Sequence, residues 1–419
     1  MRTSGRPVSR PMTVTVISPI WSRWRCWAAR VAAGLLFIVA AHAPLIAQAP
    51  KKDEFQTSAP YAILMDADSG TVLFERNADQ LAPPSSMAKL MTTELVFSMI
   101  KDERLKLDNE FTVSENAWRT GGAPSHGSTM FAAIHSEIKV SDLLQGAIIL
   151  SGNDACITLA EGIAGSEQAF AEMMTKRARE LGLTQAVFGN STGLPEQDTR
   201  MTVRELAKLA QHIINTYPDF YHYYGAHDFT WNKIHQLNRN PLLTMNIGAD
   251  GLKTGYTKEG GYGMVGSAVQ NGLRLIVVVN GLKTEKERSE EARKLLEFGF
   301  KGFESRPLFA EGDIIGGAKL YGGQKSSVSL VANGAVNLLV PRNSSDKIHG
   351  RVVYMGPVPA PVKKGQPIGQ LKIWRGDNVV LEVPLQASES IGRGSLSQRA
   401  IDAASELMIN LFRASLARL

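Results

Sequence analysis

The sequence predicts an α+β domain, built from an antiparallel sheet and helices, followed by a small all-β domain and a C-terminal amphipathic helix. Strand-like segments at residues 61–76 and 250–282 enclose a mainly helical region, and such terminal strands are expected to meet in one sheet. Residues 308–390 change to short apolar runs separated by Gly and Pro, which is typical of a small β-domain. Residues 396–419 lack both Gly and Pro and have helical periodicity.

The first domain begins with a predicted hairpin at residues 61–76, whose turn lies at residues 66–70. Its last two strands, 264–269 and 273–279, are joined at Asn271-Gly272, a strong short-range hairpin signal. Helices are expected between and after these strands, at residues 140–150, 154–163, 167–181, 202–214 and about 285–303.

Composition divides the chain into four parts. Residues 1–49 are predicted to be a leader, 50–306 the α+β domain, 307–392 the β-rich domain and 393–419 the terminal helix. The strands of the β-rich domain are expected at residues 328–331, 336–340, 351–354, 368–373 and 379–383. This domain carries no catalytic constellation, and the chain has no recognisable internal repeat.

Residues 1–49 have the pattern of a secretory signal peptide. They contain six arginines and no acidic residue, include an apolar core at residues 31–46, and end in Ala47-Gln48-Ala49. This order predicts export and removal of the leader. An uncleaved membrane anchor is the alternative, because Pro50 directly follows the Ala-x-Ala site, and Met12 is an alternative start.

The excess of basic over acidic residues in the chain comes from this leader. The chain contains 46 basic and 40 acidic residues, and without the six leader arginines the two kinds are equal in number. No nucleic-acid partner is therefore expected. Because Cys26 lies in the leader, Cys156 is alone in the processed chain, cannot form an internal disulfide, and is predicted to be a buried structural thiol.

Residues 396–419 form a predicted amphipathic helix. Its apolar side carries Ile401, Ala404, Met408, Leu411, Phe412 and Leu419. Its polar side carries Arg399, Asp402, Glu406, Asn410 and Arg413. Arginines on the polar face favour a helix that lies in a membrane interface, and packing on the protein's own surface is the alternative.

Three short motifs carry the predicted chemistry: Ser86-Met87-Ala88-Lys89, Ser151-Gly152-Asn153 and Lys253-Thr254-Gly255. Each of the first two is weak alone, since Ser-x-x-Lys recurs at Ser98, Ser136 and Ser344, and Ser-x-Asn recurs at Ser114. The order of the three motifs and their sequence context distinguish this set from the recurrences. Ser86 follows Pro83-Pro84 and opens an apolar, helix-prone run, and Lys-Thr-Gly occurs once.

Ser86 and Lys89 are spaced so that a helix places them on one face. A serine is a weak nucleophile until a base removes its proton, and a charged lysine cannot accept that proton. Burial and a second cation, here Lys253, would lower the pKa of Lys89 and expose a free amine. The combination predicts acyl transfer through Ser86.

Residues 60–300 resemble the low-molecular-mass penicillin-binding proteins, D-alanyl-D-alanine carboxypeptidases of the penicillin-binding protein 5/6 type in the β-lactamase/DD-peptidase superfamily. The resemblance rests on the three motifs, on the segments 151–156 and 251–255, and on Arg288 ahead of residues 294–300. The order of leader, catalytic domain, β-module and terminal helix is similar too. The family implies action on peptidoglycan stem peptides, covalent binding of β-lactams, and a peripheral place at the periplasmic face of the inner membrane.

The resemblance also implies a role for each matching residue. Ser86 would attack the carbonyl between the two terminal D-alanines, and Lys89 would accept its proton. Ser151 would relay a proton to the leaving D-alanine together with Lys253. Asn153 would hold a substrate amide.

The third motif would bind the other end of the scissile bond. Thr254 and Arg288, beside Gly255, would hold the terminal carboxylate, and the backbone N–H groups of Ser86 and Tyr256 would form an oxyanion hole. Tyr256 departs from some relatives, in which a histidine follows Lys-Thr-Gly. The change is tolerable if only the backbone acts there.

No cofactor or metal is expected, since His212, His222, His227 and His235 lack the spacing of a metal site. A class A β-lactamase is disfavoured, because Ile234 stands where those enzymes place a glutamate ahead of Leu237-Asn238. An endopeptidase that cleaves peptidoglycan crosslinks is an open alternative. A non-catalytic wall-binding scaffold is the least favoured.

Overall fold

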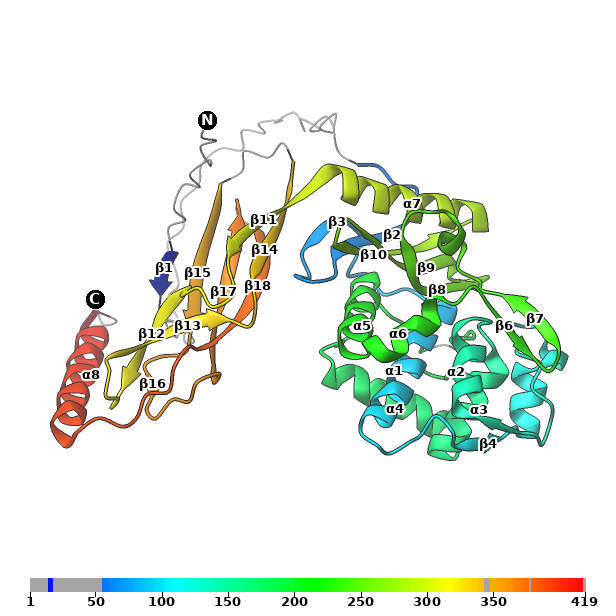
Figure 1. Cartoon of the computed structure of the whole chain (residues 1–419), viewed down its shortest axis with the longest axis horizontal. Coiled ribbons are helices and arrows are strands. Elements are labelled where there is room, and N and C mark those ends of the chain that lie inside the picture. The colour runs from blue at the N-terminus through cyan, green and yellow to red at the C-terminus, as the bar shows by residue number, and fades with distance from the viewer. Residues whose placement is uncertain (1–13, 18–54, 197, 343–346, 377, 417–419) are drawn as a thin grey trace, which may run out of the picture. The chain divides into compact units, whose positions relative to one another are not determined.

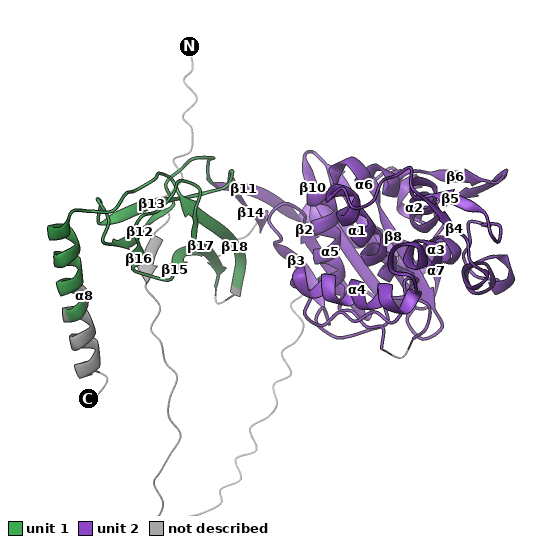
Figure 2. Cartoon of the chain, turned by 90° about the horizontal axis from the view of Figure 1, so that it is seen from below, with its two compact units in different colours: residues 1–56, 309–336, 347–419 green, residues 57–308, 337–346 purple. Residues whose placement is uncertain are grey.

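The computed structural model describes residues 14–17, 55–196, 198–342, 347–376 and 378–416. Two compact units divide the chain (Figure 2). The larger unit comprises Thr57–Leu308 and Asn337–Asp346, and the smaller unit comprises Met1–Gln56, Phe309–Val336 and Lys347–Leu419.

A five-stranded antiparallel sheet forms the centre of the larger unit (Figure 1). Its strand order is β3-β2-β10-β9-β8, with bounds β2 (Tyr61–Asp66), β3 (Val72–Arg76), β8 (Ala249–Thr257), β9 (Gly261–Gln270) and β10 (Leu273–Leu282). Strand β2 pairs antiparallel with β10, which confirms that the first and last strands of this domain meet. The predicted turn between β9 and β10 is also confirmed, since Asn271 and Gly272 have φ angles of 51° and 78°.

Helices cover both faces of this sheet. Successive side chains of a strand point to opposite faces, and apolar side chains are buried on each. Ile63 and Met65 belong to the main core with the helices before β8, whereas Leu64 packs beside Gly299 of α7 (Glu285–Gly302) on the other face. The remaining helices of the unit are α1 (Lys89–Lys101), α2 (Val140–Ile148), α3 (Asn153–Ala164), α4 (Glu167–Glu180), α5 (Val203–Thr216) and α6 (Pro218–Gly225). The expected helical segments are therefore present.

Short elements complete the larger unit. Two small antiparallel pairs join β4 (Glu110–Thr112) to β5 (Glu137–Lys139) and β6 (Asp228–Trp231) to β7 (Ile234–Leu237). The 3₁₀ turns are η1 (Ser85–Ala88), η3 (Ala123–Ser125) and η4 (Pro241–Thr244), and η2 (Ala117–Gly121) is a π-helical turn.

The smaller unit is built on a seven-stranded sheet of order β1-β15-β17-β18-β13-β12-β16. Its strands are β1 (Val14–Ile17), β12 (Gly316–Tyr321), β13 (Ser327–Ala332), β15 (Ile348–Tyr354), β16 (Val358–Pro359), β17 (Pro367–Arg375) and β18 (Asn378–Ala387). One predicted strand, β14 (Val336–Pro341), pairs instead with β11 (Phe303–Phe309). A β-rich module after the α+β domain is thus confirmed, although residues 337–346 group with the larger unit.

The two ends of the chain are described in part. Within the predicted leader, β1 pairs parallel with β15, and residues 1–13 and 18–49 lie outside the described residues. Helix α8 (Leu396–Leu416) begins where the sequence predicts it, and the backbone N–H of Gly322 donates to Asp402 Oδ2 at 2.8 Å. The side chains of Glu406 and of Met408 onward, on both predicted faces, lie outside the described residues. No described helix is long and apolar enough to span a membrane.

Candidate active site

Ser86 lies in the 3₁₀ turn η1, and Lys89 begins α1 directly after it. Side chains three residues apart eclipse one another in a 3₁₀ turn. Lys89 Nζ therefore reaches Ser86 Oγ and donates a hydrogen bond of 2.9 Å. The structure brings together the two residues on which the acyl-transfer prediction depends.

Lys89 is buried, with 1% of its surface exposed. Its ammonium also donates to Asn153 Oδ1 at 2.8 Å, at the start of α3, and to the carbonyl oxygen of Thr192 at 2.6 Å. Burial lowers the pKa of Lys89 to about 8, against the opposing effect of Cys156, Glu167 and Asp154. A substantial fraction of the amine is thus neutral near pH 8.

The two other partners of Lys89 decide where a neutral amine points. An amide oxygen and a backbone carbonyl accept hydrogen bonds and cannot donate them. When Lys89 loses a proton, its two remaining N–H groups stay with Asn153 and Thr192, and its lone pair faces Ser86 Oγ. This is the arrangement that a general base for Ser86 requires.

Lys253 is the second buried cation, on β8 with 2% of its surface exposed. Burial, and next the charge of Lys89, holds the pKa of Lys253 well below its usual value, and Arg239 and Arg288 act in the same direction. Its Nζ donates to the carbonyl oxygen of Thr254 at 3.2 Å. The charge of Lys89 therefore disfavours the charged form of Lys253, whereas burial is the cause of the lowered pKa of Lys89 itself.

Ser151 lies in the loop between α2 and α3, buried and with a φ of 60°. Directly after this loop, Asp154 fastens the start of α3 to residues 129–132, because its carboxylate accepts hydrogen bonds from Thr129 Oγ1 at 2.5 Å and from the backbone N–H groups of Met130 and Ala132 at 3.0 Å. Asn153, two residues after Ser151, contacts Lys89. The second motif thus joins the first in one site.

Arg288, on α7, is buried, and its Nη2 donates to Glu285 Oε1 at 2.7 Å. Its guanidinium also lies over the ring of Tyr262, 5.7 Å from the centroid. Among the described residues, the buried Arg288 Nε has no hydrogen-bond partner. A buried donor without a partner is costly, so this nitrogen is suited to a ligand oxygen.

The third motif lies on β8, next to the nucleophile turn. Thr254 is buried, and a Cβ on Gly255 would lie 3.0 Å from the carbonyl oxygen of Pro84 and 3.2 Å from the backbone nitrogen of Met87. Gly255 therefore lets the strand approach η1 closely. The Tyr256 ring is 52% exposed and stacks on Tyr262 with centroids 4.2 Å apart.

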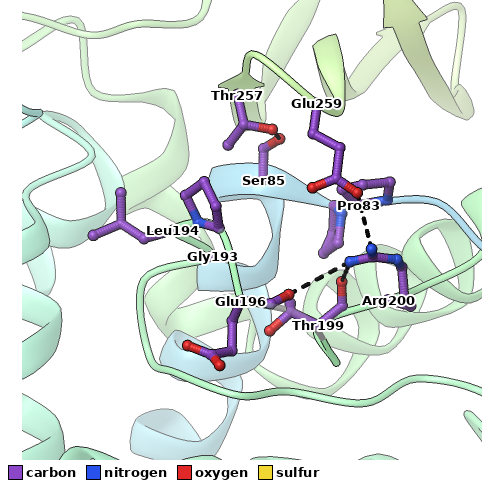
Figure 3. Close-up of a pocket in the computed structure, with 11 residues that line it drawn as sticks. Pro83, Ser85, Gly193, Leu194, Glu196, Thr199, Arg200, Thr257 and Glu259 are labelled. Carbon is purple, nitrogen blue, oxygen red and sulfur yellow. Dashed lines mark hydrogen bonds and ion pairs between the residues drawn. The ribbon is translucent and has the colours of Figure 1, made fainter.

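A small open pocket lies beside Ser85, the residue before the nucleophile (Figure 3). Segments distant in sequence form its walls, and Arg200 is paired with Glu259 at 2.9 Å on one side. The lining residues are Pro83, Pro84, Ser85, Gly193, Leu194, Pro195, Glu196, Thr199, Arg200, Thr257 and Glu259.

Two contributors to the site were not predicted from the sequence. The Thr192 carbonyl fixes Lys89, and Arg239 adds a positive charge near Lys253. The carbonyl of any residue can accept a hydrogen bond, so nothing marked Thr192. The turn-forming pair Thr192-Gly193, where Gly193 has a φ of 73°, is the signal that was available.

The other candidate residues lie apart from this chemistry. Glu94 is buried against Arg177 at 3.0 Å and His212 at 3.1 Å, so that histidine has a packing role. Cys156 is a buried free thiol, as predicted. In the described part of the chain, no group of three or more His, Cys, Asp or Glu side chains could hold a metal ion.

Acyl transfer through a serine with a lysine base is the class of chemistry to which this geometry belongs. Comparison with known proteins then gives the family. Residues 46–284 match the family model described as D-alanyl-D-alanine carboxypeptidase, and residues 303–393 match the C-terminal domain of penicillin-binding protein 5. The chain belongs to the D-alanyl-D-alanine carboxypeptidase family.

Relatives match most of the chain. The Escherichia coli D-alanyl-D-alanine carboxypeptidase DacC is 38% identical over 81% of this chain and 86% of its own length. The crystal structure of penicillin-binding protein 5 from Haemophilus influenzae is 35% identical and covers 81% of this chain and 99% of that protein, with a TM-score of 0.72. The ampicillin-bound penicillin-binding protein D2 of Listeria monocytogenes is 29% identical and covers 59% of this chain and 99% of that protein, with a TM-score of 0.51.

Proposed function

We propose that this chain is a serine-type D-alanyl-D-alanine carboxypeptidase that removes the terminal D-alanine from peptidoglycan pentapeptides. The observation that carries the proposal is the 2.9 Å hydrogen bond between Lys89 and Ser86 in a buried site with a second lysine. Membership of a family described by this activity supports the same conclusion.

The reaction begins at Ser86. Neutral Lys89 takes the hydroxyl proton as Ser86 Oγ attacks the carbonyl carbon between the two D-alanines. The resulting oxyanion is held by the backbone N–H groups of Ser86 and Tyr256. When the C–N bond breaks, the proton taken by Lys89 is relayed through Ser151, with help from Lys253, to the leaving amine. Water later hydrolyses the ester to Ser86, which releases the acyl group and restores the hydroxyl.

Substrate orientation falls to the polar groups around the nucleophile. Asn153 uses its Oδ1 for Lys89, which leaves its amide nitrogen to donate to a peptide carbonyl. Thr254, Lys253 and Arg288 take the terminal carboxylate, for which the buried Arg288 Nε supplies an unused donor among the described contacts. A free carboxylate at the end of the substrate is thereby selected.

β-Lactams are proposed to acylate Ser86 in the same way, because a β-lactam carbonyl presents the same target to the nucleophile. The ampicillin-bound relative supports this part of the proposal. Efficient hydrolysis of the acyl-enzyme formed with a β-lactam is not expected, since Ile234 stands where class A β-lactamases carry the deacylating glutamate.

The ends of the chain support a place outside the cytoplasm. We propose that residues 1–49 are removed as a signal peptide, which would also remove β1 from its pairing with β15. We propose further that α8 lies on the periplasmic face of the inner membrane. Ile401 of the apolar side supports this, because 68% of its surface is exposed while Asp402 of the polar face contacts Gly322.

The decisive experiment uses the purified protein without its leader and a pentapeptide that ends in D-Ala-D-Ala. Free D-alanine and covalent labelling by fluorescent penicillin are measured beside a Ser86→Ala control. Release and labelling that both depend on Ser86 support the carboxypeptidase. Labelling without release from the pentapeptide, but with cleavage of a crosslinked muropeptide dimer, would favour the endopeptidase. A Ser86→Ala protein labelled to unchanged stoichiometry would refute the assignment of the nucleophile.

A further inference from the structure

Ser85, the residue before the nucleophile, has an unusual backbone conformation. Its side chain is buried, with 2% of its surface exposed, and its φ is 50°, in the left-handed region that residues with a Cβ rarely adopt. Such a conformation persists only where the surroundings enforce it, and it concentrates at functional sites. The peptide unit between Ser85 and Ser86 contains the N–H that is proposed as one oxyanion donor. The conformation of Ser85 therefore sets the direction of that donor.

Two glycines leave little space beside Ser85, and Asn280 holds Pro83, two residues before it. A Cβ on Gly193 would lie 1.9 Å from the Ser85 carbonyl oxygen, and a Cβ on Gly260 would lie 2.9 Å from Ser85 Oγ. Asn280 Nδ2 donates to the carbonyl oxygen of Pro83 at 3.0 Å. Each contact involves a different part of the fold.

The Ser85 hydroxyl is joined directly to the third-motif strand. Ser85 Oγ lies 2.9 Å from Thr257 Oγ1 (Figure 3). Thr257 Oγ1 also accepts a hydrogen bond of 3.0 Å from the backbone N–H of Gly260. Thr257 directly follows Tyr256, whose N–H is the second proposed oxyanion donor. The contact between the two hydroxyls thus connects Ser85, which precedes the first donor, with Thr257, which follows the second.

We propose that Ser85 and Thr257 are positioning residues that set the spacing and direction of the two oxyanion-hole N–H groups. The proposal rests on the proposed function, because it assigns the oxyanion hole to Ser86 and Tyr256. The hydrogen bond between Ser85 and Thr257 connects η1 with β8, and the two residues are 172 positions apart in the sequence. Without it, the turn and the strand would lose a direct side-chain hydrogen bond between them, and the donors would meet the developing charge less well.

The test compares Thr257→Val, which removes the hydroxyl at nearly constant volume, with Thr257→Ser, which keeps it. We expect Thr257→Val to lower the second-order rate of penicillin acylation by about tenfold or more, since small displacements of catalytic groups have effects of this size. Thr257→Ser is expected to stay within about twofold of the parent protein, and final labelling stoichiometry is expected to be complete in both. A merely structural role would reduce the labelled fraction or the Tm and leave the rate of the folded molecules unchanged.

Two further measurements separate positioning from general damage. A peptide boronic acid, whose tetrahedral adduct uses the oxyanion hole, should lose affinity across the variants in step with the acylation rate. Ser85→Ala should cause a loss similar to that of Thr257→Val, and the double variant should be no slower than the slower single variant, because one bond is removed in each case.

Equal acylation rates in Thr257→Val and the parent would overturn the proposed positioning role of Ser85 and Thr257. Additive losses in the double variant of Ser85→Ala and Thr257→Val would overturn it too. If Ser85→Ala fails to fold, the comparison of Thr257→Val with Thr257→Ser still decides the matter. Failure of the proposed function has a different signature, because it would remove Ser86-dependent labelling from the parent protein itself.

Discussion

Lys89 is the residue whose protonation state controls the proposed chemistry. Burial lowers its pKa to about 8, and a base must lose its proton before it can accept another. We therefore expect the rate of penicillin acylation to rise with pH and to level off above a midpoint near 8. The measurement is the acylation rate between about pH 6 and pH 10 with a penicillin that does not titrate in this range. A rate that falls with rising pH through this range would contradict the role of Lys89 as a base.

Asn153 offers an electrostatic check on the same assignment. Its Oδ1 lies 2.8 Å from Lys89 Nζ, so Asn153→Asp would place a carboxylate beside the amine. A neighbouring negative charge stabilises the protonated lysine, and we expect the acylation midpoint to move upward by about one pH unit or more. Asn153→Ala is the neutral control, which should slow acylation without this upward shift. The two pH profiles, measured side by side, decide the question.

At the scale of single elements, the loop between α4 and α5 is held against the nucleophile turn. Gly193 and Gly182 have φ angles of 73° and 75°. A Cβ on Gly193 would lie 1.9 Å from the Ser85 carbonyl oxygen, whereas a Cβ on Gly182 would meet no atom within 4 Å. Gly182→Ala should cost about 1–2 kcal/mol for the left-handed backbone alone. Gly193→Ala should destabilise the protein more and reduce penicillin acylation, because Ser85 must move. Urea unfolding and labelling rates compare the two variants, and equal effects would contradict the close packing of this loop.

Helix α1 also carries Glu94, a buried carboxylate that pairs with Arg177. Glu94 is fully buried and accepts hydrogen bonds from Arg177, and Tyr217 donates to it at 3.0 Å. Burial acts to raise the pKa of Glu94, but the hydrogen bonds of His212 and Arg177 lower it overall. Its contribution to stability is thus present above its usual pKa of 4.5 and is lost as the pH falls through the lowered value.

We expect Glu94→Gln to destabilise the protein by about 2 kcal/mol, because the fully buried carboxylate loses its charge-assisted hydrogen bonds, while Arg177 keeps Glu180 as a partner at 3.1 Å. Asp102→Asn is the matched control, since Asp102 pairs with Arg104 at the surface with both side chains more than half exposed. That change should cost less than about 1 kcal/mol. Denaturant unfolding at pH 7 gives both values. Similar costs for the two substitutions would show that the Glu94 pair adds little.

At the scale of the whole molecule, the proposed membrane-binding role of the C-terminal helix α8 can be tested. Ile401→Glu with Met408→Glu should abolish sedimentation with vesicles of anionic and zwitterionic phospholipid, because both residues belong to the predicted apolar side. Ala403→Glu with Asn410→Glu adds the same charge to the polar side and should reduce binding far less. Penicillin labelling should be unchanged in both. Deletion of residues 395–419 should release the protein from membranes, and a shortened protein that still sediments with them would refute the anchor.

Much of the secondary structure could be predicted because it depends on residues close together in the chain. The hairpin at Asn271-Gly272 and the helices of the catalytic domain depend on local turn chemistry and on spacings of three to four residues. The pairing of β14 with β11 could not be predicted, since an alternating apolar run of this length fits either partner. Strand identity is local, whereas strand partnership is not.

The sequence by itself determined the three motifs, their order, the identity of Ser86 and the spacing that lets Lys89 meet it, because all of these are contained in short segments. Only the tertiary structure decided whether Lys89 could act as a base. Its partners Asn153 and Thr192 lie 64 and 103 residues away, and its lowered pKa comes from burial. Burial is a property of the packed core and is created only when distant segments close over the side chain.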